Sequence, residues 1–327
     1  MHRTTMKTVP ALLGVSALAL TACGESGEAA AEDFPESAVD VTIPFDPGDG
    51  SDVMARMVEQ YWEDEFGVGM NFEYRSGAGG TVGMMEFAST GSDDGYDLAT
   101  FNFPHISVHP AGGLADYSAD DFEFIGQIAS DYNVAVVRDD SEYESMEDFV
   151  DAAEDAPGSL SVSIPQAMDT GHIAYAQLLE DTGIDAPLVS YQSGSEQLDG
   201  ILSGDTDLAM GTMGTMGSAI DSGDLRVLGV TSPERLEYEP DWPTFLEQGY
   251  EVEIYLGRLW MVPAGTDEAL VQRYQEGFQA IADDPDFQQS MEDLGYEVEF
   301  HDGAWVDEQI AQFEEDVDEL VEQLESH

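Results

Sequence analysis

The chain has 327 residues, 42% hydrophobic and 10% aromatic, and carries 69 acidic against 9 basic residues, a formal net charge of −60. A charge of this sign repels nucleic-acid phosphates and anionic lipid headgroups, so a nucleic-acid binder and a polybasic membrane-surface protein are excluded. The apolar and aromatic content excludes an acidic disordered chain, and the length favours about two domains.

The acidic residues are spread along the chain, and Lys7 is the only lysine. This pattern predicts an acidic, solvated surface adapted to high salt. At about 1 M salt the Debye length is roughly 3 Å, so self-repulsion within such a surface is largely screened. The alternative is an acidic secreted protein with no salt requirement.

The first 23 residues predict an export signal with a lipid-attachment site. A basic start precedes an apolar run over 9–20 that is too short to span a bilayer. The run ends Leu20-Thr21-Ala22-Cys23, which resembles the lipobox of bacterial lipoproteins, and Cys23 is the single cysteine, so no disulfide forms within the chain. We predict a signal peptide over 1–22, lipidation at Cys23 and a flexible lipid-anchored tether over 23–38. The alternative is an ordinary signal peptide with an incidental cysteine.

Strand and helix patterns alternate from residue 39. We expect strands at 39–45, 70–74 and 98–103, with helices at 53–66 and 81–88 between them. A β-α-β-α-β order of this kind predicts a parallel sheet with helices on both faces. Two further strands are expected at 124–130 and 133–138.

The pattern then restarts with a second α/β unit. The expected helices lie at 146–154, 171–180, 196–202, 268–282, 285–294 and 305–324, and the expected strands at 160–164, 188–191, 208–211, 225–230 and 253–262. The long strands near 133–138 and 254–262 predict two crossovers between the units. We therefore expect two lobes with a cleft between them: one domain of 39–136 with 258–327, and a second of 137–257.

Two glycine-rich turns follow strands of the first unit. The first contributes five candidate ligand-binding residues: Phe45, Pro47, Gly48, Asp49 and Ser51. Glycines allow a tight turn, and the amides that open the next helix lie at the positive end of its dipole, which attracts an anion. Capping of that helix by Ser51 or Asp52 explains the turn equally well, and the acids lack the spacing of a calcium loop.

The second turn contributes Gly77, Ala78, Gly79 and Gly80. It makes a poor dinucleotide fingerprint, because Val82 stands where the third glycine belongs, and fits an anion-binding nest better. Both turns lie at carboxyl ends of neighbouring strands, where open α/β sheets bind ligands. Asn102, near the end of the third strand, is a further candidate.

Two helix starts in the second unit supply the remaining candidates. They offer hydroxyl groups and free amides at Asp169, Thr170, Gly171, Tyr191 and Gly194. For His172, in the first of these helices, packing is the favoured interpretation over ligand contact. Met210, Met213 and Met216 are expected to pack around a strand end.

No catalytic constellation is present in the sequence. There is no Gly-x-Ser-x-Gly elbow, P-loop or cysteine nucleophile in the mature fold, so we expect no enzyme activity, cofactor or metal. His105 and His109 have helical spacing, but Pro104 and Pro110 argue against a helical metal-binding pair.

Taken together, these motifs resemble a known family over about residues 39–320: the extracytoplasmic solute-binding receptors of tripartite tricarboxylate transporters, also called TctC or Bug-type proteins. The matching motif residues are Pro44, Phe45, Pro47, Gly48, Asp52 and Arg56; Glu73, Arg75, Gly77, Ala78, Gly79 and Gly80; Asp94, Gly95, Tyr96 and Leu98; Gly223, Leu225, Arg226, Leu228, Val230 and Thr231; Pro243, Thr244, Glu247 and Gly249; and Pro263, Ala264, Gly265 and Thr266.

Three positions depart from the family pattern. Asp49 replaces the second glycine of the first loop, Tyr74 replaces the usual asparagine, and the loop over 164–170 lacks glycines. The first departure puts a carboxylate near the expected anion site. Arg75 could contact the ligand, but pairing with a nearby acid is favoured.

The resemblance implies a two-lobed periplasmic-binding-protein fold of type II, in which two α/β domains are joined by crossover strands. It implies capture of a di- or tricarboxylate, or another small carboxylate, in the cleft and delivery to a membrane permease with a large and a small subunit. We expect a lipid-anchored monomer outside the cytoplasmic membrane. The alternatives are a sensor subunit for a membrane signalling protein and a secreted α/β enzyme.

Overall fold

The computed structural model describes residues 34–326, and its two sheets share one long strand, β4 (Phe122–Arg138). The first part of β4 pairs with β9 (Tyr255–Pro263), and its last residues pair with β7 (Leu208–Thr212) and β8 (Leu225–Val230). The sequence predicted two strands here. They form one strand because Asp131, which reads as a polar break, is fully buried in an ion pair with Arg258.

The first lobe contains the sheet order β2-β1-β3-β9-β4. β1 (Val39–Ile43) is parallel to β2 (Met70–Tyr74) and β3 (Asp97–Phe103), as predicted. β10 (Tyr296–Asp302), which the sequence analysis missed, is antiparallel to β4. The helices are α2 (Gly50–Phe66), α3 (Thr81–Thr90), α4 (His105–Ala111), α9 (Glu268–Ala282), α10 (Pro285–Glu292) and α11 (Gly303–Phe313).

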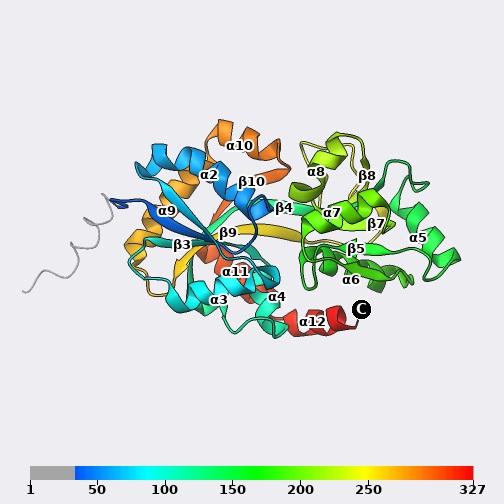
Figure 1. Ribbon diagram of the computed structural model, residues 1–327, viewed down its shortest axis with the longest axis horizontal. Helices are drawn as coiled ribbons and strands as arrows, with labels where there is room; N and C mark the ends of the chain where they lie inside the picture. The colour runs from blue at the N-terminus through cyan, green and yellow to red at the C-terminus, as the bar shows by residue number, and fades with distance from the viewer. Residues whose placement is uncertain (1–33, 327) are drawn as a thin grey trace, which may run out of the picture.

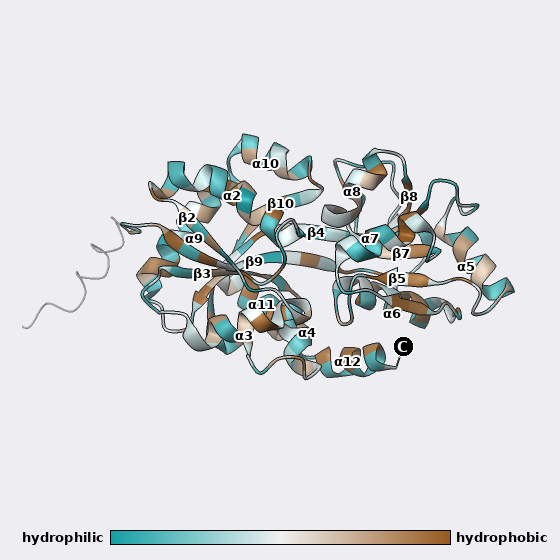
Figure 2. Cartoon of the chain, in the orientation of Figure 1, coloured by the Kyte–Doolittle hydropathy of each residue, from teal (hydrophilic) through white to brown (hydrophobic). Residues whose placement is uncertain are grey.

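Apolar side chains cover both faces of this sheet. One core packs α2, α9 and α10 around Trp62 and Trp260. The other packs α3, α4 and α11 around Phe101 and Met261. Figure 2 shows the apolar residues on the strands and hydrophilic residues on the outer helix surfaces, and Figure 1 shows the helices above and below the sheet.

The second lobe repeats this plan on a smaller sheet. β5 (Val162–Ile164) is parallel to β6 (Leu188–Ser190) and to β7. The helices are α5 (Met146–Asp155), α6 (Thr170–Thr182), α7 (Gly194–Ser203) and α8 (Met213–Asp221). α8 was not predicted: Met213 and Met216 are core residues of this helix, whereas Met210 is buried in β7.

The C-terminal region predicted as one helix over 305–324 is two helices. The chain turns after α11, and α12 (Val317–Glu325) packs against both α4 and α6 (Figure 1, red). Val317, Val321 and Leu324 join the apolar core beneath α6. The last helix therefore lies against the second lobe, although α11 belongs to the first.

The crossover segments are tied together where they leave the second lobe. The backbone N–H of Asn133 donates to Thr231 Oγ1 at 3.0 Å, and that hydroxyl donates to the Ile254 carbonyl at 2.6 Å. Asn133 and Thr231 are completely buried. This arrangement fixes the relative position of three chain segments at the junction of the lobes.

The described chain begins with a packed residue. Phe34 is buried, with its ring edge-on to Tyr96 and Tyr274, so the end of the predicted tether is part of the first lobe's core. The predicted signal peptide and Cys23 lie outside the described residues. Among residues 34–326, no helix combines the length and apolar character needed to cross a bilayer.

Candidate ligand-binding site

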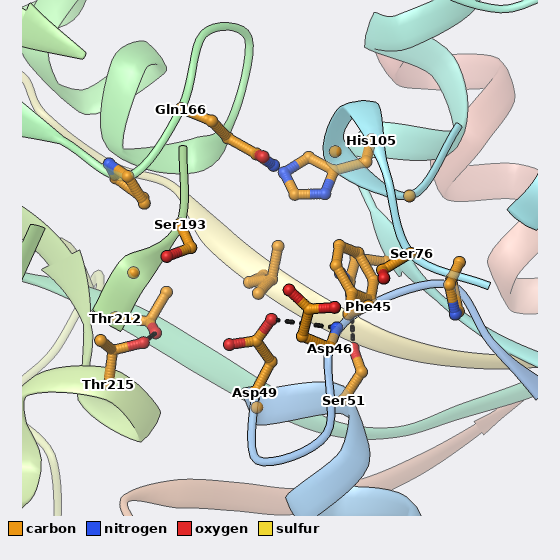
Figure 3. Close-up of a pocket in the computed structure, with 18 of the residues that line it drawn as sticks. Phe45, Asp46, Asp49, Ser51, Ser76, His105, Gln166, Ser193, Thr212 and Thr215 are labelled. Carbon is orange, nitrogen blue, oxygen red and sulfur yellow. Dashed lines mark hydrogen bonds between the residues drawn. The ribbon is translucent and has the colours of Figure 1, made fainter. Parts of the chain in front are cut away.

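A cavity of about 290 Å³ lies between the lobes. Its walls are the loops after β1, β2 and β3 on one side and those after β5, β6 and β7 on the other (Figure 3). Leu256 and Arg258 of β9 also line it, and we call this part of the lining the floor. The carboxyl ends of parallel strands meet at one edge of each sheet, so these loops converge. α2 and α7 both begin at residues that line the cavity, Gly50 and Gly194.

The cavity brings together most of the residues predicted from the sequence. The predicted residues that line it are Phe45, Asp49, Ser51, Gly77, Ala78, Gly79, Gly80, Asn102 and Gly194. Those that do not line it are Pro47, Gly48, Asp169, Thr170, Gly171 and Tyr191. Whether the first group contacts a ligand stays a prediction.

Arg258 is the cationic residue of the cavity floor, and its side chain is only 3% exposed. Its Nη2 lies 2.7 Å from Asp131 Oδ2, and its Nη1 donates to Asn102 Oδ1 at 3.2 Å and Ser51 Oγ at 3.3 Å. The register of β3 and β9 places Asn102 directly opposite Arg258. The sequence analysis missed Arg258, although a lone arginine in an apolar strand predicts a buried partner.

Two glycines are required for this close packing. A Cβ on Gly50 would lie 2.6 Å from Arg258 Nη2, so only glycine lets the start of α2 approach the guanidinium. Gly80 has φ +91°, and a Cβ there would lie 2.8 Å from Phe101 Cε2. These glycines hold the two predicted loops against the strands.

Two carboxylates face the cavity from the loop after β1. Asp46 and Asp49 both line it, and the Asp46 N–H donates to Asp49 Oδ2 at 3.3 Å. Partial burial raises the pKa of Asp49; repulsion from Asp46 acts in the same direction, and Arg258 opposes it. Asp49 was expected near the anion site, and Figure 3 shows its carboxylate inside the cavity.

Asp52 has a structural role in the same loop. Its carboxylate accepts from the Gly48 N–H and the Tyr74 hydroxyl, both at 2.7 Å, and pairs with Arg56 at 2.9 Å. Tyr74, one of the departures from the family pattern, thus holds this loop from the neighbouring strand. These bonds explain why Gly48 lies behind the cavity wall.

In the second lobe, the residues that line the cavity are sequence neighbours of the predicted ones. Asp169 is buried as the N-cap of α6 and accepts from the His172 N–H at 2.9 Å; burial raises its pKa to about 7. His172 Nδ1 in turn accepts from the Met168 N–H, as expected of a packing residue. Pro165 and Gln166 of this loop line the cavity instead, as do Gln192 and Ser193 in place of Tyr191, whose ring packs on Gly200.

Pro104 and Pro110 were expected to argue against a helical metal-binding pair at His105 and His109, but they do not prevent the helix. α4 forms because Pro104 precedes its first turn and Pro110 lies in its last turn, and the rings of His105 and His109 stack at 4.9 Å. Burial lowers the pKa of both, that of His109 to about 4, so both are neutral at pH 7. His105 lines the cavity.

Arg75 lies outside the cavity. It pairs with Glu73 at 2.6 Å and with Glu86, which confirms the structural interpretation favoured from the sequence. Among residues 34–326, Arg258 is therefore the only arginine or lysine that lines the cavity.

Comparison with known proteins decides the family. The family model described as the tripartite tricarboxylate transporter family receptor, TctC, matches residues 54–324. The chain belongs to this family. TctC proteins are extracytoplasmic solute-binding receptors rather than enzymes, which agrees with the sequence-based expectation.

Relatives of this TctC receptor share its length and fold. Protein BugT of Bordetella pertussis is 24% identical over 269 residues, covering 80% of this chain and 81% of BugT. MatC of Rhodopseudomonas palustris, solved with malate, has a TM-score of 0.77 at 20% identity and covers 88% of this chain and 100% of its own. Rpa4515 of R. palustris, solved with adipate, has a TM-score of 0.80 at 19% identity, with coverage of 89% and 98%. These structures confirm the predicted two-lobed fold.

Proposed function

We propose that this TctC receptor captures a small carboxylate in the cavity between its lobes. The observation that carries the proposal is the cavity floor, where Arg258, Asn102 and Ser51 form one hydrogen-bonded cluster beside the start of α2. Guanidinium, amide and hydroxyl donors at a helix N-terminus suit a carboxylate. The malate bound to MatC and the adipate in the Rpa4515 structure support the same ligand class.

Calorimetry in 2 M KCl tests this function. The panel comprises dicarboxylates, monocarboxylates and amino carboxylates of three to six carbons, with the matching neutral amides as controls. We expect a carboxylate to bind and its amide to bind at least tenfold more weakly. Asn102→Ala should weaken binding at least tenfold, because a hydrogen bond to a charged group contributes about 1.5–3 kcal/mol. Asn71→Ala, on an exposed bond to Asp40, is the matched control.

Two results would overturn the proposal. One is that no carboxylate of the panel binds. The other is that Asn102→Ala binds like the wild type, which would place the ligand elsewhere.

We further propose that the receptor is lipid-anchored through Cys23, acts as a monomer outside the cytoplasmic membrane, and delivers its ligand to a permease with a large and a small subunit. Family membership supports delivery, and the lipobox-like Leu20-Thr21-Ala22-Cys23 supports anchoring. Cys23→Ser should release the protein into the soluble fraction, and persistence in washed membranes would contradict the anchor. A sensor role is the alternative; loss of carboxylate uptake on deletion of the gene distinguishes transport from sensing.

We also propose two domains, one of residues 39–136 with 258–327 and one of residues 137–257. The assignment of α12 to the first domain is the open point, because this helix packs on α6 of the second.

Adaptation to high salt is proposed from the net charge of −60. The distribution of burial supports it: among residues 34–326 the buried carboxylates are Asp52, Asp131 and Asp169, so the remaining acids of this range are at least partly solvated.

A further inference from the structure

We propose that the ligand is a zwitterion: a carboxylate that also carries a positively charged nitrogen, which binds to Asp46 and Asp49. This inference rests on the proposed function and narrows its ligand class. It concerns the charge balance of the cavity.

The cavity wall has more negative than positive side chains. Its charged residue types are Asp46, Asp49 and Arg258. Arg258 is already paired with the buried Asp131 at 2.7 Å, so the positive charge of the floor is matched before a ligand enters. Asp46 and Asp49 have no such cation: no ion pair within 4.0 Å involves either of them in the described part of the chain.

A plain dicarboxylate fits this balance poorly. One carboxylate can take the donors of Arg258, Asn102 and Ser51, but the other would add negative charge to a cavity that already holds two carboxylates. Asp49 is half-buried, whereas Asp46 is exposed. Bulk salt screens an exposed charge well and a half-buried one less, so the repulsion from Asp49 is the part that persists at high salt. A ligand ammonium replaces the repulsion with attraction.

The position of the acids supports a ligand with two different ends. Figure 3 shows the carboxylates of Asp46 and Asp49 inside the cavity, on the side toward Ser193 and Thr212 of the second lobe in this view. The cluster of Arg258, Asn102 and Ser51 forms the floor beneath the start of α2. The cavity thus offers donors at its floor and acceptors on the loop after β1.

His105 provides an independent observation. It lines the cavity, is 4% exposed, and neither of its ring nitrogens has a hydrogen-bond partner within residues 34–326. Because burial lowers its pKa, the imidazole is neutral and does not offset Asp46 and Asp49. A neutral imidazole has one N–H donor and one acceptor nitrogen, so His105 can meet either end of a zwitterion.

An inorganic cation is a poorer occupant on the donor set. Residues 34–326 contain no group of three or more His, Cys, Asp or Glu residues arranged to hold a metal ion. Calcium takes six to eight oxygen ligands, which the two acids alone do not supply.

The test compares probes of matched length by calorimetry in 2 M KCl: γ-aminobutyrate, its trimethylammonium analogue, glutarate and butyrate. We expect one of the two zwitterions to bind at least tenfold more tightly than glutarate and butyrate. Asp49→Asn should reduce that preference about tenfold, and Asp46→Asn, whose side chain is exposed, should reduce it less; each should tighten glutarate binding. Asp241→Asn, on an exposed surface of the second lobe, is the charge-matched control.

The outcomes separate the two proposals. If glutarate binds the wild type as tightly as the zwitterions and Asp49→Asn leaves the preference unchanged, this inference is overturned while carboxylate binding stands. If glutarate binds tightly only when Na⁺, Mg²⁺ or Ca²⁺ is supplied, an inorganic cation meets the acids and the inference is again overturned. Binding of no carboxylate by any variant refutes the proposed function itself. Melting temperatures of each variant verify folding.

Discussion

Replacing Arg258 with methionine is expected to destabilise the fold by about 3–5 kcal/mol. The side chain is 3% exposed and Asp131 is completely buried, so the substitution leaves a buried carboxylate without its counter-charge. Asn102 and Ser51 also lose the donor at 3.2–3.3 Å. Methionine keeps much of the volume against the Tyr296 ring, which lies 5.3 Å from the guanidinium carbon.

The effect is large enough to measure by urea unfolding and thermal melts at pH 7 in 2 M KCl. One kcal/mol shifts the melting temperature of a large domain by roughly 2–4 °C, so we expect a decrease of roughly 6–20 °C. Arg235→Met is the matched control, because Arg235 pairs with Glu247 at the same 2.7 Å but the side chains are 43% and 46% exposed. Such exposed pairs contribute up to about 1 kcal/mol.

A double variant identifies the source of the cost. Arg258→Met with Asp131→Leu removes the orphaned charge, and apolar replacement of a whole buried pair is often neutral, so most of the lost stability should return. If Arg258→Met costs no more than Arg235→Met, the burial argument is refuted. If the double variant is as unstable as the single one, the cost comes from lost packing rather than from the unpaired carboxylate.

Three further predictions follow from charge, burial and backbone geometry. The fold should be less stable at 0.1 M than at 2 M salt, because the Debye length falls from about 10 Å to a few Å; a melting temperature that does not change would contradict the salt adaptation inferred from the charge of −60. The pKa of Asp169 is raised from 3.8 to about 7, so the folded state binds a proton more tightly than the unfolded state, and the free energy of unfolding should fall by up to roughly 4 kcal/mol between pH 4 and pH 7. Asp169→Asn keeps the cap of α6 and should flatten this pH dependence in urea titrations. An unchanged pH dependence would assign it to other groups. Gly79 has φ +67° and its Cβ would lie 3.1 Å from Gln166 Nε2, so Gly79→Val should weaken carboxylate binding at least tenfold and cost the fold about 1–2 kcal/mol. Gly79→Asn, which tolerates this backbone conformation, separates strain from lost space, and wild-type affinity in both variants would place the ligand elsewhere.

The fold could largely be predicted because its strands and helices alternate with clear apolar periods. Of the elements that were missed, α8 lacks such a signal, because it is a glycine- and methionine-rich helix without polar periodicity. β10 does carry one: Tyr296, Val298 and Phe300 alternate with polar residues, which is the pattern of a half-buried strand. β4 was divided at Asp131 because a carboxylate within an apolar run reads as a break unless its partner is known. That partner, Arg258, is more than a hundred residues away along the chain.

Long-range contacts also limited what could be predicted of the site. Loops after strands were predictable from strand order, and the cavity does form from the loops after β1 and β2. In the second lobe the predicted loops line the cavity with different residues, such as Gln166 in place of Asp169, because the N-cap of α6 is turned into the core. Periodicity identifies which loop reaches the cleft, but the direction of each side chain depends on helix capping and on contacts between the lobes.

The position of α12 has a mechanical consequence for any motion between the lobes. This helix contacts α4 on one side and α6 on the other, and Val108 of α4 belongs to the same apolar core as Val321 and Leu324. If one lobe rotates, α12 must therefore move with it and slide against the other lobe, or part of that core becomes exposed to water. α4 also places His105 in the cavity, so one short helix contacts both α12 and the ligand site. The packing of the C-terminal helix thus adds to the energetic cost of separating the lobes, at a distance from the cavity.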